Sequence, residues 1–209
     1  MKTTIVTEGR GEFSAFKTMF KSLETSDGAL APRILHIACQ PDGPIKGIAK
    51  ACEPAMRQAS ARKIDLFVLV IDRELQQLNP GTLAKNLKSA LEKSSPGTFC
   101  IEVVYKDRTF ENWLVSDLDA LRSQPARFAV SDAIVRQVEP NKADRVQALD
   151  ILKAATQGKQ YDKIADGKKI ADRLDVMAAA RNSRSFRHML HVLGHVAYLD
   201  QSKYPASMS

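Results

Sequence analysis

The chain has 209 residues, of which 44% are hydrophobic and 26% are charged, as is typical of a soluble globular protein that can bury a core. No apolar run approaches the roughly 18 residues of a membrane-spanning helix, and the N-terminus lacks the apolar segment of a signal peptide. Three scattered cysteines without a Cys-x-x-Cys pair exclude a disulfide framework and indicate a reducing cytoplasm. The net charge of +7 permits a nucleic-acid partner without requiring one.

The first 120 residues or so alternate predicted strands with predicted helices. β-Branched and apolar runs predict strands at residues 3–7, 33–38, 66–71 and 99–105. Apolar residues at helical spacing predict helices at residues 13–23, 45–62, 83–91 and 110–121. This alternation indicates βαβ units, and therefore an α/β fold with a mainly parallel four-stranded sheet flanked by helices.

The strand at residues 66–71 is the centre of the pattern. Its six apolar residues have no polar interruption, as expected for a strand buried on both faces. Asp72 and Glu74 follow at once, at the carboxyl end of the strand, where open α/β sheets bind their ligands. An extended backbone there would direct both carboxylates to the same side.

Beyond Pro125 the sequence predicts no strand. Helical segments are expected near residues 144–156, 162–180 and 185–199. We therefore expect an α/β core over residues 1–122 and a helical C-terminal extension over residues 123–209, packed on that core.

Acidic residues follow three of the predicted strands: Glu8 and Glu12 the first, Asp72 and Glu74 the third, and Glu111 the fourth. Each has a purely structural interpretation as a turn former, a helix cap or a first-turn acid. Two carboxylates about 4 Å apart repel by about 4 kcal/mol at an effective dielectric constant near 20. A fold that gathers several therefore needs protons or a cation. Oxygen ligands without a nearby Cys or His favour Mg²⁺ or Mn²⁺ over zinc.

Two segments that contain these acids resemble a known family. They are Val6–Glu12 and Val70–Glu74. A strand that ends in Glu-Gly with a further acid, and an apolar strand that ends in Asp-x-Asp or Asp-x-Glu, resemble the Toprim domain of topoisomerases, primases and the overcoming-lysogenization-defect nucleases. Here the second acid is Glu74 in place of the commoner aspartate.

More narrowly, the chain is similar to a bacterial Toprim-like family of unknown function that is often encoded beside ATPases in defence islands. The shared motifs are Phe110–Leu114, Tyr161–Lys163, Gly167–Ile170 and the pair Ser185-Phe186. The resemblance spans most of the chain, but each motif is short.

The resemblance implies metal-dependent phosphodiester cleavage. Glu8 would be a general acid/base or a metal ligand, and Glu12 would be a further metal ligand. Asp72 and Glu74 would hold one or two Mg²⁺ (or Mn²⁺) ions, and Glu111 would support the site. The chain would be the nuclease subunit of an ATPase-linked antiviral defence system, with nucleic acid and an ATPase as partners and with a homo-oligomer possible. No membrane partner is implied.

Basic residues fit a polyanionic substrate. Residues 159–191 contain eight lysine and arginine residues against four aspartates, although a solvated helix face would look similar. Lys163 could contact a phosphate as a catalytic residue, or could pair with Asp162 or Asp166. The expected nucleic-acid contacts are Arg10, Lys106, Arg108, Lys168, Lys169, Arg184 and Arg187.

Other patterns leave alternatives open. His188, His191 and His195 have a spacing compatible with a metal site, but they more simply flank a packing face. No Walker A loop occurs, so ATP hydrolysis by this chain is not expected. One alternative to a nuclease is a non-catalytic Toprim-like module that docks on an ATPase. Another is a receiver-like domain in which Asp72 is phosphorylated beside Glu8 and Lys106.

Overall fold

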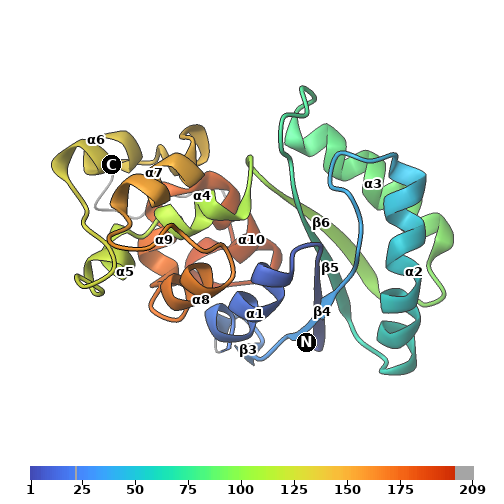
Figure 1. Cartoon of the computed structure of the whole chain (residues 1–209). Coiled ribbons are helices and arrows are strands. Elements are labelled where there is room, and N and C mark those ends of the chain that lie inside the picture. Colours follow the sequence, from blue (N-terminus) through green and yellow to red (C-terminus); the bar gives the residue numbers. More distant parts are fainter. Residues whose placement is uncertain (22, 201–209) are drawn as a thin grey trace.

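A four-stranded parallel sheet divides the molecule into two layers of helices (Figure 1). The computed structural model describes residues 1–21 and 23–200. The strand order is β4-β1-β5-β6, and all three pairings are parallel. The strands are β1 (Thr3–Thr7), β4 (Arg33–His36), β5 (Leu66–Asp72) and β6 (Cys100–Lys106). The α/β class expected from the sequence is confirmed.

The two faces of the sheet have different covers (Figure 1). Helices α2 (Ile45–Ala61) and α3 (Pro80–Ser94) cover one face, and α1 (Arg10–Met19) lies with the C-terminal helices on the other. Alternate residues of β5 enter the two cores. Phe67 and Leu69 pack with α2 and α3, whereas Val68 and Val70 pack with α1 and the C-terminal helices. A strand covered on both sides needs the continuous apolar run seen in the sequence.

The chain after β6 is helical, as expected. Its helices are α4 (Phe110–Val115), α5 (Leu118–Arg122), α6 (Asp132–Val138), α7 (Ala148–Ala155), α8 (Ala165–Ala171), α9 (Val176–Asn182) and α10 (Arg184–Val192), with 3-10 turns η1 (Ala143–Arg145) and η2 (Val196–Tyr198). Trp113 joins this region to the sheet core: it is fully buried, stacks on Phe16 and meets the edge of Phe186. Its Nε1 donates to Ser185 Oγ at 2.8 Å. No helix in the described residues is long and apolar enough to cross a membrane.

Several predicted boundaries are wrong. The first helix ends at Met19, and Leu23 belongs to a short antiparallel hairpin of β2 (Leu23–Thr25) and β3 (Gly28–Leu30). Leu23 is buried in the same core as α1, so its helical spacing was coincidental. The helix expected at residues 110–121 is two helices, because Asp117 caps a new one by accepting the N–H groups of residues 119 and 120. Helix α6 was not expected.

Candidate metal centre

Three carboxylates from three segments meet at the carboxyl edge of the sheet. Glu8 follows β1, Glu12 lies in the first turn of α1, and Asp72 is the last residue of β5. One oxygen of each lies within 4.8 Å of the others. Glu12 is buried, with 4% of its surface exposed, and Glu8 and Asp72 are partly buried. The convergence inferred from parallel strand ends is therefore present for these three residues.

Lys106 lies among these carboxylates. It ends β6, and the parallel register pairs it directly with Asp72. Its Nζ lies 2.8 Å from Asp72 Oδ1 and 3.4 Å from Glu8 Oε1, and it also contacts Glu12 Oε1. The Lys106 side chain is fully buried. It therefore offers no surface to a polyanion, and its expected role as a nucleic-acid contact does not fit the structure.

A backbone N–H group binds Glu8, and the glycine after it leaves room for Glu12. The Asp72 N–H donates to Glu8 Oε1 at 2.8 Å. Gly9 follows Glu8 and directly precedes α1, and a Cβ added there would lie 3.2 Å from Glu12 Oε1. That separation is tight for a carbon–oxygen contact, so glycine leaves room for the Glu12 side chain to fold back over the turn. The Glu-Gly pair of the sequence motif thus has a steric reason.

Ionisation of all three carboxyl groups is unfavourable in the metal-free cluster. Burial raises the pKa of Glu12 well above its usual range, and Lys106 offsets only part of this effect. Burial likewise raises the pKa of Asp72 to about 7, against the pull of Lys106 and with the support of Glu8. Burial alone would lower the pKa of Lys106, but Asp72, Glu12 and Glu8 together raise it. Lys106 therefore stays protonated, and its one ammonium group contacts three carboxyl groups.

The free oxygens of the cluster suit a hard cation. Glu8 Oε2 and Glu12 Oε2 are buried and accept no hydrogen bond from the described residues. A buried carboxylate oxygen without a donor is costly. The donor set consists of oxygen atoms only, which Mg²⁺ and Mn²⁺ prefer. The residues present therefore fit such an ion.

The cluster opens into a pocket of about 350 Å³. Arg10, Glu111 and Lys163 also line it. Lys163 Nζ lies 3.2 Å from Glu111 Oε1, and the Lys163 side chain is 63% exposed. The pairing partner of Lys163 is thus Glu111, rather than Asp162 or Asp166 as the sequence allowed.

A residue that the sequence did not single out holds the segment before Lys163. Arg127 Nε and Nη2 donate to the two oxygens of Asp166, at 3.0 and 2.6 Å. Its guanidinium also donates to the carbonyls of Gln157, Lys159 and Gln160. Asp166 in turn accepts the N–H of residue 162 at 2.9 Å. These hydrogen bonds of Arg127 and Asp166 fix the loop that carries Lys163. No local sequence motif predicts them.

Glu74 does not join the cluster. Its φ of 54° is left-handed, so the extended alternation expected after Asp72 breaks at this residue. The Glu74 N–H donates instead to the carbonyl of Arg108 at 2.9 Å, and Arg108 itself has a φ of 89°. Glu74 lies outside the group of close carboxylates, and it does not line the pocket. Its expected role as a direct ligand is therefore not supported by the geometry.

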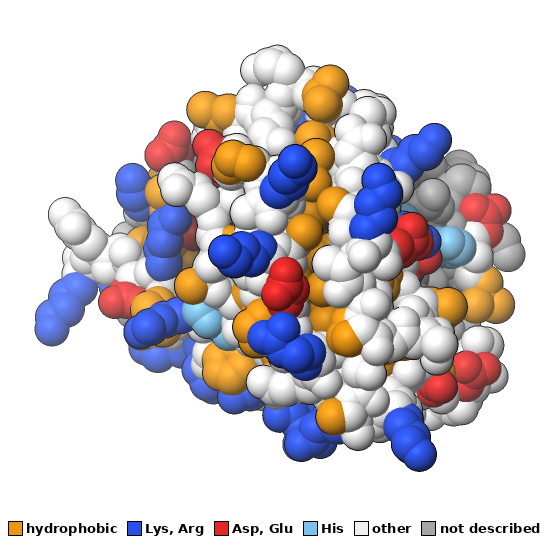
Figure 2. Space-filling model, turned by 90° about the vertical axis from the view of Figure 1, so that its right-hand side faces the viewer, with side chains coloured by type: hydrophobic (Ala, Val, Ile, Leu, Met, Phe, Trp, Pro, Cys, Tyr) orange, Lys and Arg blue, Asp and Glu red, His pale blue; other side chains and the backbone are white. Residues whose placement is uncertain are grey.

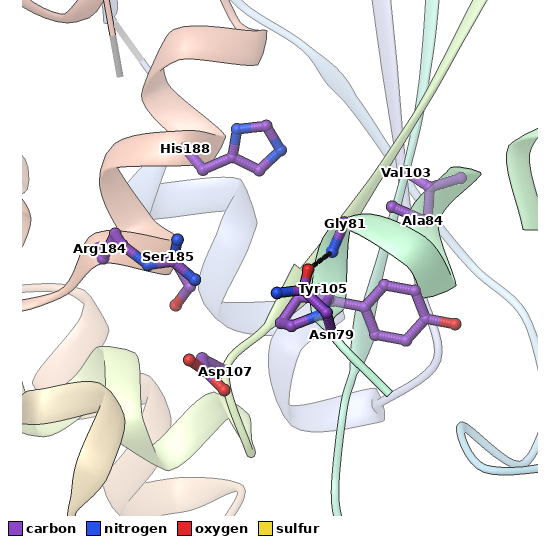
Figure 3. Close-up of a pocket in the computed structure, with 10 residues that line it drawn as sticks. Asn79, Gly81, Ala84, Val103, Tyr105, Asp107, Arg184, Ser185 and His188 are labelled. Carbon is purple, nitrogen blue, oxygen red and sulfur yellow. Dashed lines mark hydrogen bonds between the residues drawn. The ribbon is translucent and has the colours of Figure 1, made fainter. Parts of the chain in front are cut away.

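The remaining basic residues lie in different places. Arg10, Lys168 and Lys169 are exposed, and Lys168 pairs with Asp172 at 2.6 Å. Arg187 is 1% exposed and donates to the carbonyl of Ala180 at 2.6 Å, so a direct contact with nucleic acid does not fit. Arg184 lines a separate pocket of about 180 Å³ beside β6, α3 and α10 (Figure 3).

The three histidines are spread over that region. His188 lines the pocket of Figure 3, His191 Nδ1 lies 3.2 Å from the carbonyl of Tyr198, and His195 caps η2. Within the part of the chain that the structure describes, they form no group with metal-compatible spacing.

Positive charge also gathers on the α2 and α3 layer, which the sequence reasoning did not consider. Figure 2 faces this side, and its basic side chains outnumber its acidic ones. Some of the basic residues are paired: Arg57 with Glu53 at 3.5 Å, and Lys88 with Glu102 at 2.8 Å. The exposed basic residues of the two helices are Lys46, Lys50, Arg57, Lys85 and Lys93.

The raised pKa of Asp72 predicts a pH dependence. Its pKa of about 7 in the folded protein exceeds the usual value of 3.8, so the folded state binds the proton more tightly than the unfolded state. The free energy of unfolding of the metal-free protein should therefore fall as the pH rises from about 4 to about 7. Asp72→Asn should reduce this slope, measured by urea denaturation in EDTA. Glu92→Gln, at an exposed residue of α3, should leave it unchanged; equal slopes for wild type and Asp72→Asn would contradict the assignment.

Comparison with known proteins identifies a family. A family model described as "Domain of unknown function (DUF4276)" matches residues 7–194. The matched segment contains the three carboxylates of the cluster and Lys106. No curated protein and no solved structure gave a match. Since the family model covers most of the chain, this protein belongs to the family described as domain of unknown function DUF4276.

Proposed function

We propose that this protein is a metal-dependent phosphodiester-cleaving nuclease of Toprim type, with Mg²⁺ or Mn²⁺ as its cofactor. The observation that carries the proposal is the convergence of Glu8, Glu12 and Asp72 around buried oxygens that lack a hydrogen-bond donor among the described residues. This cluster opens into a pocket at the carboxyl edge of a parallel sheet, the usual place for ligands in such folds.

The residues around the pocket suit the parts of such a reaction. Glu8, Glu12 and Asp72 would hold the ion, and Glu8 could alternatively serve as general acid/base. A divalent cation there supplies a Lewis acid that polarises the phosphodiester and stabilises developing negative charge. Lys163 also lines the pocket and would bind a phosphate oxygen, with Glu111 fixing its position at 3.2 Å. Arg10, exposed at the pocket rim, would bind the adjoining phosphate.

The biological setting is proposed from the sequence resemblance and the charge. A net charge of +7 suits a nucleic-acid substrate, DNA or RNA. From the resemblance to ATPase-associated Toprim-like proteins we propose an ATPase partner, assembly as a homo-oligomer, and a role in antiviral defence in the cytoplasm.

Cleavage in the presence and absence of metal tests the proposal. The purified protein should cut labelled single-stranded DNA, duplex DNA or RNA in millimolar Mg²⁺ or Mn²⁺, and it should lose this activity in EDTA. Thermal unfolding in the same buffers should show stabilisation by the metal, because only the folded state assembles the three carboxylates. Cleavage that is unaffected by EDTA would contradict the proposal.

The second candidate is a non-catalytic module that docks on an ATPase. The contacts of Lys106 with all three carboxylates favour it, because the ammonium neutralises part of the cluster without metal. Such a protein should show neither cleavage nor a thermal shift with Mg²⁺ or Mn²⁺. Labelling of Asp72 by acetyl phosphate would instead indicate the receiver-like alternative.

A further inference from the structure

We infer that Lys106 is a resident cation of the metal centre, which limits the centre to one divalent ion and takes the place of a second. The inference rests on the proposed function and extends it to the number of metal ions. It concerns a residue that neither sequence motif contains, since Lys106 lies outside both Val6–Glu12 and Val70–Glu74.

The position of Lys106 is the first argument. Its Nζ meets one oxygen of each carboxylate: Glu8 Oε1, Glu12 Oε1 and Asp72 Oδ1. The side chain is fully buried, so it cannot turn toward solvent without leaving the cluster. A cation that contacts three carboxylates from three segments occupies the place expected of a bridging metal ion.

The division of the oxygens is the second argument. Lys106 takes one oxygen of each glutamate and leaves the other. Those remaining atoms, Glu8 Oε2 and Glu12 Oε2, are buried and have no donor among the described residues. The ammonium therefore leaves one buried oxygen of each glutamate available to an ion. Water and substrate oxygens would complete the coordination shell, as is usual for Mg²⁺.

Charge is the third argument. When all three carboxyl groups are ionised, as metal ligation requires, the one ammonium leaves an excess of two negative charges, which one divalent ion matches. The neighbouring Glu111 adds no excess because Lys163 pairs with it, and Glu74 lies outside the cluster. A second divalent ion would face a buried ammonium with no carboxylate left over, so repulsion would disfavour it.

Metal stoichiometry tests this inference. Equilibrium dialysis against Mn²⁺, with metal and protein both quantified, should give one ion per chain for the wild type. Lys106→Met, which removes the charge but keeps most of the volume, should take up two. Lys88→Met removes a lysine from a half-exposed pair with Glu102, and should still bind one. The double variant Lys106→Met with Glu12→Gln loses one charge of each sign and should also bind one.

The outcomes separate the two proposals. Two Mn²⁺ ions per wild-type chain would overturn the inference about Lys106 and leave the nuclease proposal intact. No bound Mn²⁺ would overturn the metal centre itself. If Lys106→Met alone fails to fold, Lys106→Gln, whose amide can still donate to a carboxylate, takes its place and should bind two ions; two ions in the double variant would contradict the charge argument. A purely structural role of Lys106 would leave the count at one in every variant that folds, and would also overturn the inference.

Discussion

Lys106→Met is expected to lower the free energy of unfolding of the metal-free protein by about 3–5 kcal/mol at neutral pH, the usual effect of removing one partner of a buried ion pair. The variant leaves Glu8, Glu12 and Asp72 close together without the ammonium that contacts all three. The lost methylene packing is small because methionine fills a similar volume, so most of the effect is electrostatic. Urea denaturation in EDTA, followed by circular dichroism, measures it.

A control variant and the effect of added metal test whether the lost stability is electrostatic. Lys88→Met breaks a surface pair and should cost less than about 1 kcal/mol. Addition of Mg²⁺ or Mn²⁺ should restore more stability to Lys106→Met than to the wild type, because the variant has more negative charge to neutralise. If Lys106→Met is as stable as Lys88→Met in EDTA, Lys106 does not compensate the carboxylates.

Asp72→Asn and Glu8→Gln are expected to reduce metal-dependent cleavage by about a hundredfold or more. Metal-ion catalysis stabilises the transition state by several kcal/mol, and about 1.4 kcal/mol corresponds to a tenfold change in rate. The amides nearly preserve size but remove a charged ligand oxygen. The metal-free variants should be as stable as the wild type or slightly more stable, since each removes one repelling carboxylate from the cluster. Initial cleavage rates at saturating Mg²⁺ measure the first effect, and urea denaturation the second.

Glu92→Gln provides the matched control for these activity measurements. It also converts a carboxylate to an amide, but at an exposed position of α3, and it should cleave like the wild type. If Asp72→Asn and Glu8→Gln both cut DNA and RNA at the wild-type rate, the cluster is not the catalytic centre. Loss of cleavage together with a large loss of stability would instead point to unfolding, which the denaturation curves detect.

The sequence by itself determined the sheet and the meeting of its acids. The six apolar residues before Asp72 require a strand covered on both sides, and short connections between strand and helix make the strands parallel. Parallel strands end at a common edge, so residues that follow β1 and β5 come together whatever the details of packing. For this reason Glu8, Glu12 and Asp72 could be grouped from their positions alone, although the same reasoning also put Glu74 and Glu111 in the group, and these two lie outside the cluster.

Only the tertiary structure decided which charged residues complete the site. The sequence placed Lys106 beside Asp72 only in the receiver-like alternative and otherwise among the surface cations, because its burial depends on the register of β6 against β5 and on the packing of α1 over that edge. Glu74 lies two residues after Asp72 and was expected on the same side, but its left-handed backbone takes it out of the cluster. Arg127 binds Asp166, which lies 39 residues away in the sequence. Contacts of this kind join residues far apart in the chain, and local patterns encode which residues lie in a strand or helix, not which side chains those elements bring together.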